Sequence, residues 1–303
     1  MVIISLSPSA FCSKVFNRNF DPARKAGFFC AIMKNKEVID HIVNWLNNYC
    51  QTNKMNGFVI GISGGIDSAL TSTLCAKTGK KVIVLSMPIR QHKEELNRAA
   101  QHIDWLKNNF KNVTSHAVDL TSIFEKMETT YPKEIAEDFL TMANTRARLR
   151  MSTLYAFAGH HHMLVAGTGN KVEDFGVGFY TKYGDGGVDV SPIADLMKSE
   201  VFALAKELGV IDVILKAKPT DGLWPDKRSD EDQLGASYDE LEWAMNFTNE
   251  KSTSAKATVD EKKADINLSE RQKEVMKLFT KLNSTNRHKM LPIPVCIIPP
   301  ALR

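Results

Sequence analysis

The sequence predicts an α/β fold in which helices cover both faces of a doubly wound parallel sheet. The first observation is that short apolar runs alternate with segments whose apolar residues recur at helical spacing. The second is that a glycine-rich break and then a helix follow directly after the first apolar run. Strand–helix alternation of this kind builds parallel sheets that are buried on both faces.

Four apolar runs are expected to form the strands of this sheet. They are short and are separated by segments with turn or helix signals, as buried parallel strands are. Asn56-Gly57 breaks the chain directly before the first run. The predicted strands span residues 58–62, 82–87, 113–118 and 163–167.

Helical periodicity fills the intervals between the strands and most of the chain after them. Gly79 is placed as a helix stop, and Ser122-Ile-Phe-Glu125 has the pattern of a capping box for a short helix. Ser269 is expected to open the last helix. The predicted long helices span residues 38–49, 67–78, 96–106, 133–159, 199–208, 238–247 and 270–282.

The chain is expected to contain one domain, from residue 33 to residue 303, which is within the usual size range. Residues 1–32 are basic and poor in acids, and we expect a disordered N-terminal extension. A targeting peptide, or an over-long start with Met33 as the true initiator, are the alternatives. Residues 221–235 and 251–267 are expected to form mobile loops.

The composition is that of an ordinary globular protein, with 43% hydrophobic and 24% charged residues. A net charge of +4 is too weak to indicate nucleic-acid binding by itself. The five cysteines are odd in number and no pair has C-x-x-C spacing, which disfavours a disulfide framework and a zinc site. This cysteine usage fits a reducing, cytoplasmic compartment best. No run of apolar residues is long enough for a membrane-spanning helix.

The break after the first predicted strand reads Gly61-Ile-Ser-Gly-Gly-Ile-Asp-Ser68. A loop between a parallel strand and a helix is where such sheets bind ligands. Its glycines let backbone N–H groups approach an anion, and the helix N-terminus adds a partial positive charge. Asp67 would repel a bare phosphate and therefore makes sense as a magnesium ligand. A tight turn capped by Asp67 or Ser68 is the structural alternative.

The loop has neither the Walker pattern nor the dinucleotide fingerprint. It resembles the Ser-Gly-Gly-x-Asp-Ser loop of the ATP pyrophosphatases, which adenylate an oxygen and release pyrophosphate. Later motifs resemble the ammonia-dependent NAD synthetases within that group: Gly167-Thr-Gly-Asn-Lys-Val-Glu173, Thr181-Lys-Tyr-Gly-Asp-Gly-Gly187, Lys218-Pro-Thr220 and His288-Lys289. The resemblance implies an adenine nucleotide alpha hydrolase-like fold and the amidation of deamido-NAD by ammonia, with ATP and Mg²⁺.

The resemblance also implies roles for individual residues and a homodimer whose deamido-NAD site draws on both subunits. ATP would be held by Gly61, Ile62, Ser63, Gly64, Gly65, Ile66, Asp67, Ser68, Thr168, Lys198 and Thr220. Deamido-NAD would be bound by Arg148, Lys182, Asp189, His288 and Lys289. Magnesium would be held by Asp67 and Glu173, and the catalytic set is Asp67, Glu173, Lys198 and Asp185. Asp185 enters that set as an acid able to bind ammonium and take its proton, a role open to Asp189 as well.

Three features depart from the pattern or limit it. Many family members have Asp-His where this chain has Gly169-Asn170, and the interval from Glu173 to Lys182 is one residue longer, which predicts a small bulge. Arg146, Arg148 and Arg150 alternate on one predicted helix, so at least one is expected to be a solvated surface charge. Only about 57 residues come before the first predicted strand, too few for the glutaminase domain of the glutamine-dependent relatives, so we expect free ammonia as the nitrogen source unless a separate glutaminase chain supplies it.

Two other functions are compatible with the loop. An enzyme that adenylates a tRNA base would be expected to carry a strongly basic face or an added RNA-binding domain. A catalytically silent nucleotide-binding module would be expected to have lost Asp67, Glu173 or Lys198, and all three are present.

Overall fold

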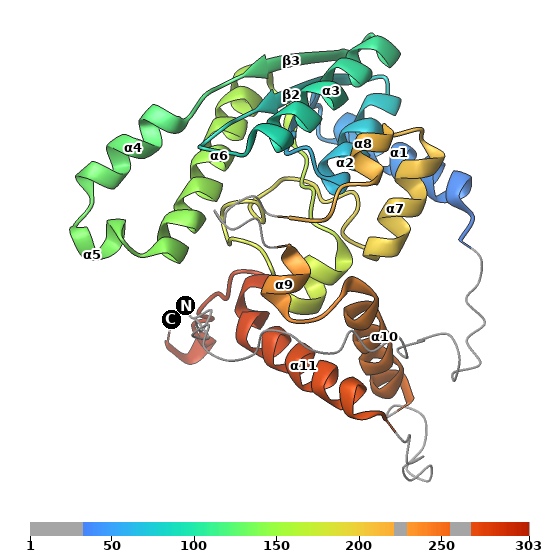
Figure 1. Ribbon diagram of the computed structural model, residues 1–303, viewed down its shortest axis with the longest axis vertical. Helices are drawn as coiled ribbons and strands as arrows, with labels where there is room; N and C mark the ends of the chain where they lie inside the picture. Colours follow the sequence, from blue (N-terminus) through green and yellow to red (C-terminus); the bar gives the residue numbers. More distant parts are fainter. Residues whose placement is uncertain (1–32, 221–228, 255–267, 303) are drawn as a thin grey trace.

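The computed structural model describes residues 33–220, 229–254 and 268–302. Its sheet has four parallel strands in the order β3-β2-β1-β4 (Figure 1). The strands are β1 (Gly57–Gly61), β2 (Lys81–Ser86), β3 (Val113–Ala117) and β4 (Leu164–Val165). Phe58 pairs with Val82 on one side and with Leu164 on the other, so β1 is central. The predicted parallel sheet is confirmed.

Alternate residues of the strands enter two different cores. Phe58 and Ile60 pack with α1 (Asn35–Thr52), α2 (Ile66–Lys77), α3 (Lys93–Asn109), α7 (Lys198–Glu207) and α8 (Asp212–Leu215). Val59 and Leu85 pack on the opposite face with α4 (Thr121–Thr130) and α6 (Phe139–His161). Successive strand residues point to opposite faces, so two apolar cores require helices on both sides. The doubly wound arrangement is therefore as predicted.

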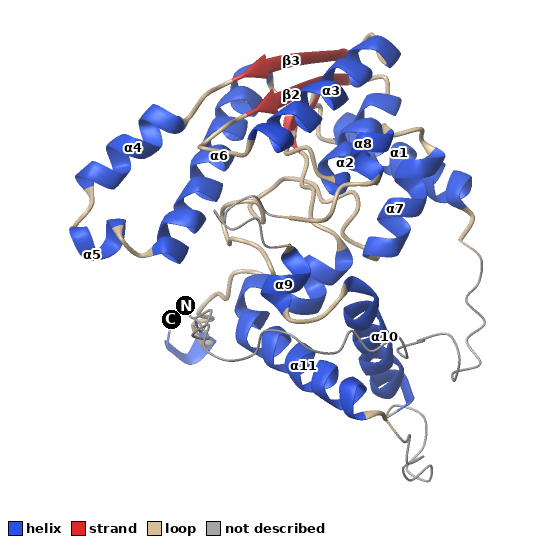
Figure 2. Cartoon of the chain, in the orientation of Figure 1, coloured by secondary structure: helices blue, strands red, loops and turns tan. Residues whose placement is uncertain are grey.

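A third group of helices lies on the other side of the loops that follow β4 (Figure 2). It consists of α9 (Asp230–Leu234), α10 (Tyr238–Ser254), α11 (Glu270–Met290) and the π-helical turn η1 (Val172–Val177). These elements share their own apolar core. The loops between the sheet and this helical layer hold most of the polar residues considered below. The chain also contains α5 (Lys133–Ala136) and η2 (Pro300–Leu302).

Most predicted elements are present, and the differences have local causes. The single helix predicted over 133–159 is broken into α5 and α6, because Asp138 accepts a hydrogen bond from the Thr141 N–H and starts a new helix. The capping box predicted at Ser122 is wrong: α4 begins at Thr121, whose N–H donates to Asp119. Ser269 does cap α11 through such a box, as predicted.

The two predicted loops are only partly described. Residues 229–235 are not a loop, because Ser229 caps the short helix α9 and Gly235 ends it with φ +77°. The helix α10 continues to Ser254 and so enters the second predicted loop. Residues 1–32, 221–228 and 255–267 lie outside the described part of the chain. None of the described helices combines the length and apolarity that crossing a membrane requires.

His102 is a histidine enclosed in the core between α2 and α3. Its side chain is fully buried, its Nε2 lies 3.0 Å from the Ser72 Oγ, and its ring stacks on Trp105. Burial disfavours the charged imidazolium and lowers the pKa of His102 to about 4. The fold therefore holds a neutral histidine where the unfolded chain would hold one that titrates near pH 6.5.

We expect the free energy of unfolding to fall as the pH is lowered from about 6.5 to about 4. In that window the unfolded chain takes up a proton at this site and the folded chain does not, so protons favour unfolding. The loss attributable to His102 is on the order of 3 kcal/mol, at about 1.4 kcal/mol per pKa unit. Urea unfolding of the wild type and of His102→Gln across this range measures it. The variant should lose less stability than the wild type, and parallel pH profiles would contradict the prediction.

Candidate functional site

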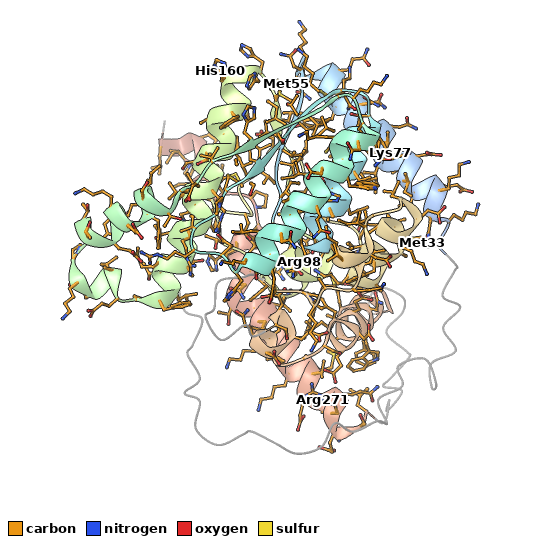
Figure 3. The ribbon with its side chains drawn as sticks, turned by 45° about the horizontal axis from the view of Figure 1, so that its top comes forward. Met33, Met55, Lys77, Arg98, His160 and Arg271 are labelled. Carbon is orange, nitrogen blue, oxygen red and sulfur yellow. The ribbon has the colours of Figure 1, made fainter. Side chains whose placement is uncertain are left out.

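The glycine-rich loop connects the end of β1 to the start of α2, as expected. Gly64 has φ +86°, and a Cβ there would lie 2.7 Å from the Glu95 carbonyl oxygen on α3, so only glycine fits without distortion. Arg98, also on α3, stabilises the contact between Gly64 and α3, because its Nε donates to the Gly64 carbonyl oxygen at 3.3 Å. Figure 3 shows Arg98 at the end of α3 that faces the α10–α11 layer, whereas Met55 and His160 lie at the opposite end of the sheet.

The two serines of the loop bond to each other and to the loop backbone. The Ser63 and Ser68 hydroxyl oxygens are 3.1 Å apart, and the Ser68 hydroxyl donates to the Gly65 carbonyl oxygen at 3.0 Å. Ser68 also accepts from the Ser63 N–H, while Ser63 accepts from the Gly65 N–H. These bonds hold the loop in a tight turn directly before α2, at the N-terminus of that helix. Such an arrangement suits an anion.

Lys198, at the start of α7, joins two carboxylates at the mouth of this loop. Its Nζ lies 2.7 Å from Asp67 Oδ2 and 2.9 Å from Glu173 Oε1, with the lysine side chain 3% exposed. Burial alone would lower the pKa of Lys198, but the attraction of Asp67 and Glu173 outweighs it and raises that pKa above its usual range. The ammonium therefore stays charged across the physiological range.

Glu173 has a second donor that the sequence analysis did not assign. The Tyr238 hydroxyl, at the start of α10, donates to Glu173 Oε1 at 2.5 Å. Burial would raise the pKa of Glu173, but Lys198 and this hydroxyl outweigh it and hold the pKa below its ordinary value. Glu173 is thus a carboxylate, and it ties the helical layer to the sheet.

Asn170 occupies a position where many family members have histidine, and it forms hydrogen bonds with both Asp67 and Glu173. Its Nδ2 donates to Asp67 Oδ1 at 3.0 Å, and its Oδ1 accepts from the Glu173 N–H at 3.1 Å. The side chain is completely buried. One amide therefore sets the orientation of Asp67 and the position of Glu173 together, which is a supporting role of the kind that holds metal ligands in place.

The neighbouring Gly169 leaves room for another acid. A Cβ at Gly169 would lie 2.2 Å from the Asp174 carboxylate, so that carboxylate occupies the space a side chain would need. Burial, followed by the charges of Glu173, Asp185 and Asp67, raises the pKa of Asp174 to about 8. Asp174 lies in the π-helical turn η1, the kind of wide turn that accommodates an additional residue. The bulge predicted between Glu173 and Lys182 is consistent with this turn.

Asp67 and Glu173 are the side chains that could share a divalent cation. In the described ranges no group of three or more His, Cys, Asp or Glu side chains is arranged as a metal site. Two carboxylates nevertheless suit Mg²⁺, because this ion commonly takes one or two carboxylates and fills its shell with phosphate oxygens and water. Two carboxylates against one ammonium also leave a net negative charge, which favours a cation.

Four of the predicted substrate-binding residues lie together where α6, the loop after η1 and the end of α11 meet. Lys182 Nζ donates to the His288 carbonyl oxygen at 3.0 Å, and Arg148 Nε donates to the Lys182 carbonyl oxygen at 3.3 Å. Lys289 Nζ donates to the carbonyl oxygens of Gly178 and Tyr180. These contacts go to the backbone, so the cationic side chains fasten the end of α11 to the loop in this state.

The remaining predicted residues are distributed around this centre. Asp185 accepts from the Thr181 N–H at 3.0 Å within the turn that the Gly-Asp-Gly-Gly sequence forms. Both oxygens of Asp189 are already used, by the Val165 N–H at 2.8 Å and the Tyr155 hydroxyl at 3.0 Å. Thr168 lies in the segment between β4 and η1. Thr220 is the last residue before an undescribed segment.

The expectation that one of three alternating arginines on α6 would be a solvated charge is wrong. None of the three is fully exposed. The Arg146 guanidinium lies over the rings of Phe124 and Phe139, Arg148 reaches the Lys182 carbonyl, and Arg150 reaches the Met87 carbonyl. The reason is that α4, α5, the strand ends and the loop after η1 surround this half of α6 on several sides.

Sequence reasoning missed Tyr238, Asn170 and Asp174 as members of the site. Tyr238 was predicted only as the first residue of a helix, and that position did not indicate a role in the site. Asn170 and Asp174 are within four residues of Glu173, yet their hydrogen bonds and burial depend on where α2 and α7 lie. No sequence signal could have supplied those positions.

We expect Gly169→Ala to lower the free energy of unfolding by about 1–3 kcal/mol, because the new Cβ meets the Asp174 carboxylate. Gly159→Ala is the matched control, since a Cβ there has no heavy atom within 4 Å. In a double-mutant cycle, Asp174→Ala should relieve most of the loss caused by Gly169→Ala. Equal effects of the two alanine substitutions, or strict additivity in the cycle, would contradict this prediction; denaturant titration measures both.

Comparison with known proteins places this geometry in a family. Residues 38–292 match the family model described as NAD synthase. The NH(3)-dependent NAD(+) synthetase of Methanosarcina acetivorans is 35% identical over 260 residues, which cover 84% of this chain and 96% of that protein.

Solved structures agree in fold. The structure of NMN synthetase from Francisella tularensis superposes with a TM-score of 0.72 at 30% identity, covering 88% of this chain and 99% of that one. The NH3-dependent NAD synthetase from Campylobacter jejuni, in complex with the nitrate ion, has a TM-score of 0.67 at 25% identity, with 88% and 100% covered. Together with the loop after β1 and the acids around Lys198, these matches show that the chain belongs to the NAD synthase family.

Proposed function

We propose that this protein amidates deamido-NAD with ammonia at the expense of ATP, giving NAD, AMP and pyrophosphate. The observation that carries the proposal is the pairing of Lys198 with Asp67 and Glu173 beside the glycine-rich loop. Its relatives named NH(3)-dependent NAD(+) synthetases support the choice of substrates. The cysteines of the described ranges, Cys50, Cys75 and Cys296, form no disulfide. This supports a location of the enzyme in the reducing cytoplasm.

In the proposed reaction a carboxylate oxygen of deamido-NAD attacks the α-phosphate of ATP, and pyrophosphate leaves. The resulting mixed anhydride is a good electrophile, so ammonia can displace AMP from it. The loop from Gly61 to Ser68 would hold the phosphates, with Thr168 and Thr220 as further ATP contacts. Lys198 would neutralise negative charge that develops on the phosphates. No covalent protein nucleophile is required.

Mg²⁺ would be held by Asp67 and Glu173, with Asn170 orienting both ligands. When bound, the ion supplies Lewis-acid stabilisation of phosphate charge. For ammonium, the Asp185 carboxylate is a better candidate than Asp189, because both oxygens of Asp189 accept hydrogen bonds, from the Tyr155 hydroxyl and from the Val165 N–H. Asp185 would bind ammonium and take its proton before attack.

Deamido-NAD would lie against Arg148, Lys182, His288 and Lys289, with Asp189 supporting the end of β4. In this proposal the cationic side chains exchange some backbone contacts for the anionic groups of the substrate. That exchange is favourable because charge-assisted hydrogen bonds to phosphate are stronger than neutral ones.

A homodimer is part of the proposal, because the substrate site would draw on both subunits. The helices α4 and α5 project from the body beside α6 (Figure 1). Large exposed apolar side chains lie on α4, directly after it, on α5 and at the first residue of α6. These are Ile123, Tyr131, Ile135 and Phe139. Exposed apolar groups gathered on neighbouring elements favour a partner surface. Sedimentation equilibrium would reveal the oligomeric state.

A second product is also proposed for testing, because a structurally similar protein is an NMN synthetase. A mononucleotide would need the same loop and the same acids around Lys198, but fewer contacts beyond the nicotinate half. The two reactions differ only in whether the substrate is the dinucleotide or the smaller mononucleotide. Comparing kcat/KM for deamido-NAD with kcat/KM for deamido-NMN therefore distinguishes them.

The test mixes the purified protein with ATP, Mg²⁺, ammonium and either deamido-NAD or deamido-NMN, and measures NAD or NMN together with pyrophosphate. We expect turnover that requires Mg²⁺ and falls by at least about a hundredfold in Lys198→Met, the loss typical when a transition-state charge contact is removed. Lys216→Met is the control, because that lysine is exposed and pairs only with Asp212 one turn away. Pyrophosphate no higher than in a no-substrate control would contradict the proposed function.

A further inference from the structure

Arg150, on α6, has no assigned role in the mechanism above. Its Nε donates to the Met87 carbonyl oxygen at 3.1 Å, and Met87 follows directly after β2. Its Nη2 is buried and has no hydrogen-bond partner among the described residues. A guanidinium N–H that is both buried and unpaired costs free energy, so such a group generally awaits a partner.

The charges around Arg150 favour an anion as that partner. Arg146 repels it, whereas Asp185 and Glu95 attract it. No ion pair within 4.0 Å joins Arg150 to a carboxylate of the described chain. Burial, and then Arg146, lower the pKa of Arg150 to about 10, so it remains a cation at neutral pH. A buried cation without a counterion is destabilising, and an arriving anion would remove that cost.

The position of Arg150 indicates which anion this is. At the end of β1, a Cβ on Gly61 would lie 3.1 Å from Met87 Cε, so the Met87 segment adjoins the start of the glycine-rich loop. Gly64 of that loop packs on the Glu95 carbonyl, and Glu95 and Asp185 are the acids that act on Arg150. The guanidinium is therefore bound to the segment that adjoins the ATP loop, and Gly184, next to Asp185, packs against the same helix at Ala147. The two substrates must meet there if the proposed function holds.

We propose that Arg150 binds the α-phosphate, the group that ATP, the adenylate intermediate and AMP have in common. The inference rests on the proposed function and adds a residue to it. The bond from Nε to the Met87 carbonyl holds the planar guanidinium in place, and Nη2 donates to a non-bridging phosphate oxygen. Arginine suits this task because its donors form a fixed fork that matches phosphate geometry.

Arg150 stabilises the negative charge of the α-phosphate and neither donates nor accepts a proton in the reaction. In the first step a carboxylate oxygen forms a bond to the α-phosphorus, the bond from that phosphorus to the bridging oxygen breaks, and its electron pair leaves with pyrophosphate. Arg150 stays protonated and neutralises the non-bridging oxygens throughout. In the second step ammonia attacks the carbonyl carbon, the bond from that carbon to the phosphate oxygen breaks, and its electron pair leaves with AMP, still bound by Arg150. The proton that the nitrogen loses as it becomes the amide passes to water.

The test measures binding of AMP, adenosine and inorganic pyrophosphate to the full chain by isothermal titration calorimetry. Arg150→Gln should weaken AMP binding at least tenfold and change adenosine and pyrophosphate binding less than twofold, because only AMP carries the α-phosphate. Arg150→Lys, which keeps the charge but loses the fork, should fall between the wild type and Arg150→Gln. Arg90→Gln is the control, since Arg90 is exposed and already paired with Glu125 and Glu128.

Three results would overturn the inference: unchanged AMP affinity in Arg150→Gln, equal losses for AMP and adenosine, or no AMP binding by the wild type. Equal losses would mean that Arg150 only supports the Met87 segment. If Arg150→Gln does not fold, Arg150→Lys decides, with AMP binding at least threefold weaker and adenosine binding unchanged as the expected result. A protein that binds AMP through Arg150 but forms neither NAD nor NMN would contradict the proposed function and leave this inference standing.

Discussion

The ammonium of Lys198, shared by Asp67 and Glu173, is the interaction on which the rest of the structure depends. Lys198 begins α7, Asp67 lies in the first turn of α2, Glu173 lies in η1, and Tyr238 at the start of α10 completes the set. One buried cation thus joins the sheet's own helices to the separate helical layer. Because an incomplete buried ion group is strongly destabilising, all of these elements must be in place together.

The charges at this end of the sheet are separated in a way that suits transfer of an adenylyl group to a carboxylate. Acids collect where η1 meets α2, and cationic side chains from α6 and α11 lie on the other side of the loop after η1. The parallel sheet makes this possible, because loops at the carboxyl ends of neighbouring strands converge. Gly64 and Gly169 contribute by the absence of a side chain: each lets another group approach closely.

Much of the fold could be predicted because its determinants are local. The order of strands and helices follows from apolar periodicity, and Ser269 caps α11 through bonds to its own neighbours. Errors arose where two local signals competed. Asp138 interrupts a continuous helical pattern with a stronger capping bond, and Asp119 starts α4 ahead of the pattern at Ser122. The expectation that one of Arg146, Arg148 and Arg150 would be solvated was wrong because segments distant in sequence pack around this half of α6.

The sequence by itself determined the elements, the glycine-rich loop and the family resemblance, because spacing and residue type suffice for backbone geometry and local hydrogen bonds. Only the tertiary structure decided how the charges are shared. Lys198 and Asp67 are 131 residues apart in the chain yet lie 2.7 Å apart in space. Burial and neighbouring charges raise the pKa of Asp174. The Nη2 of Arg150 is buried without a hydrogen-bond partner among the described residues. Electrostatic effects act through space, so no pattern along the chain can specify them.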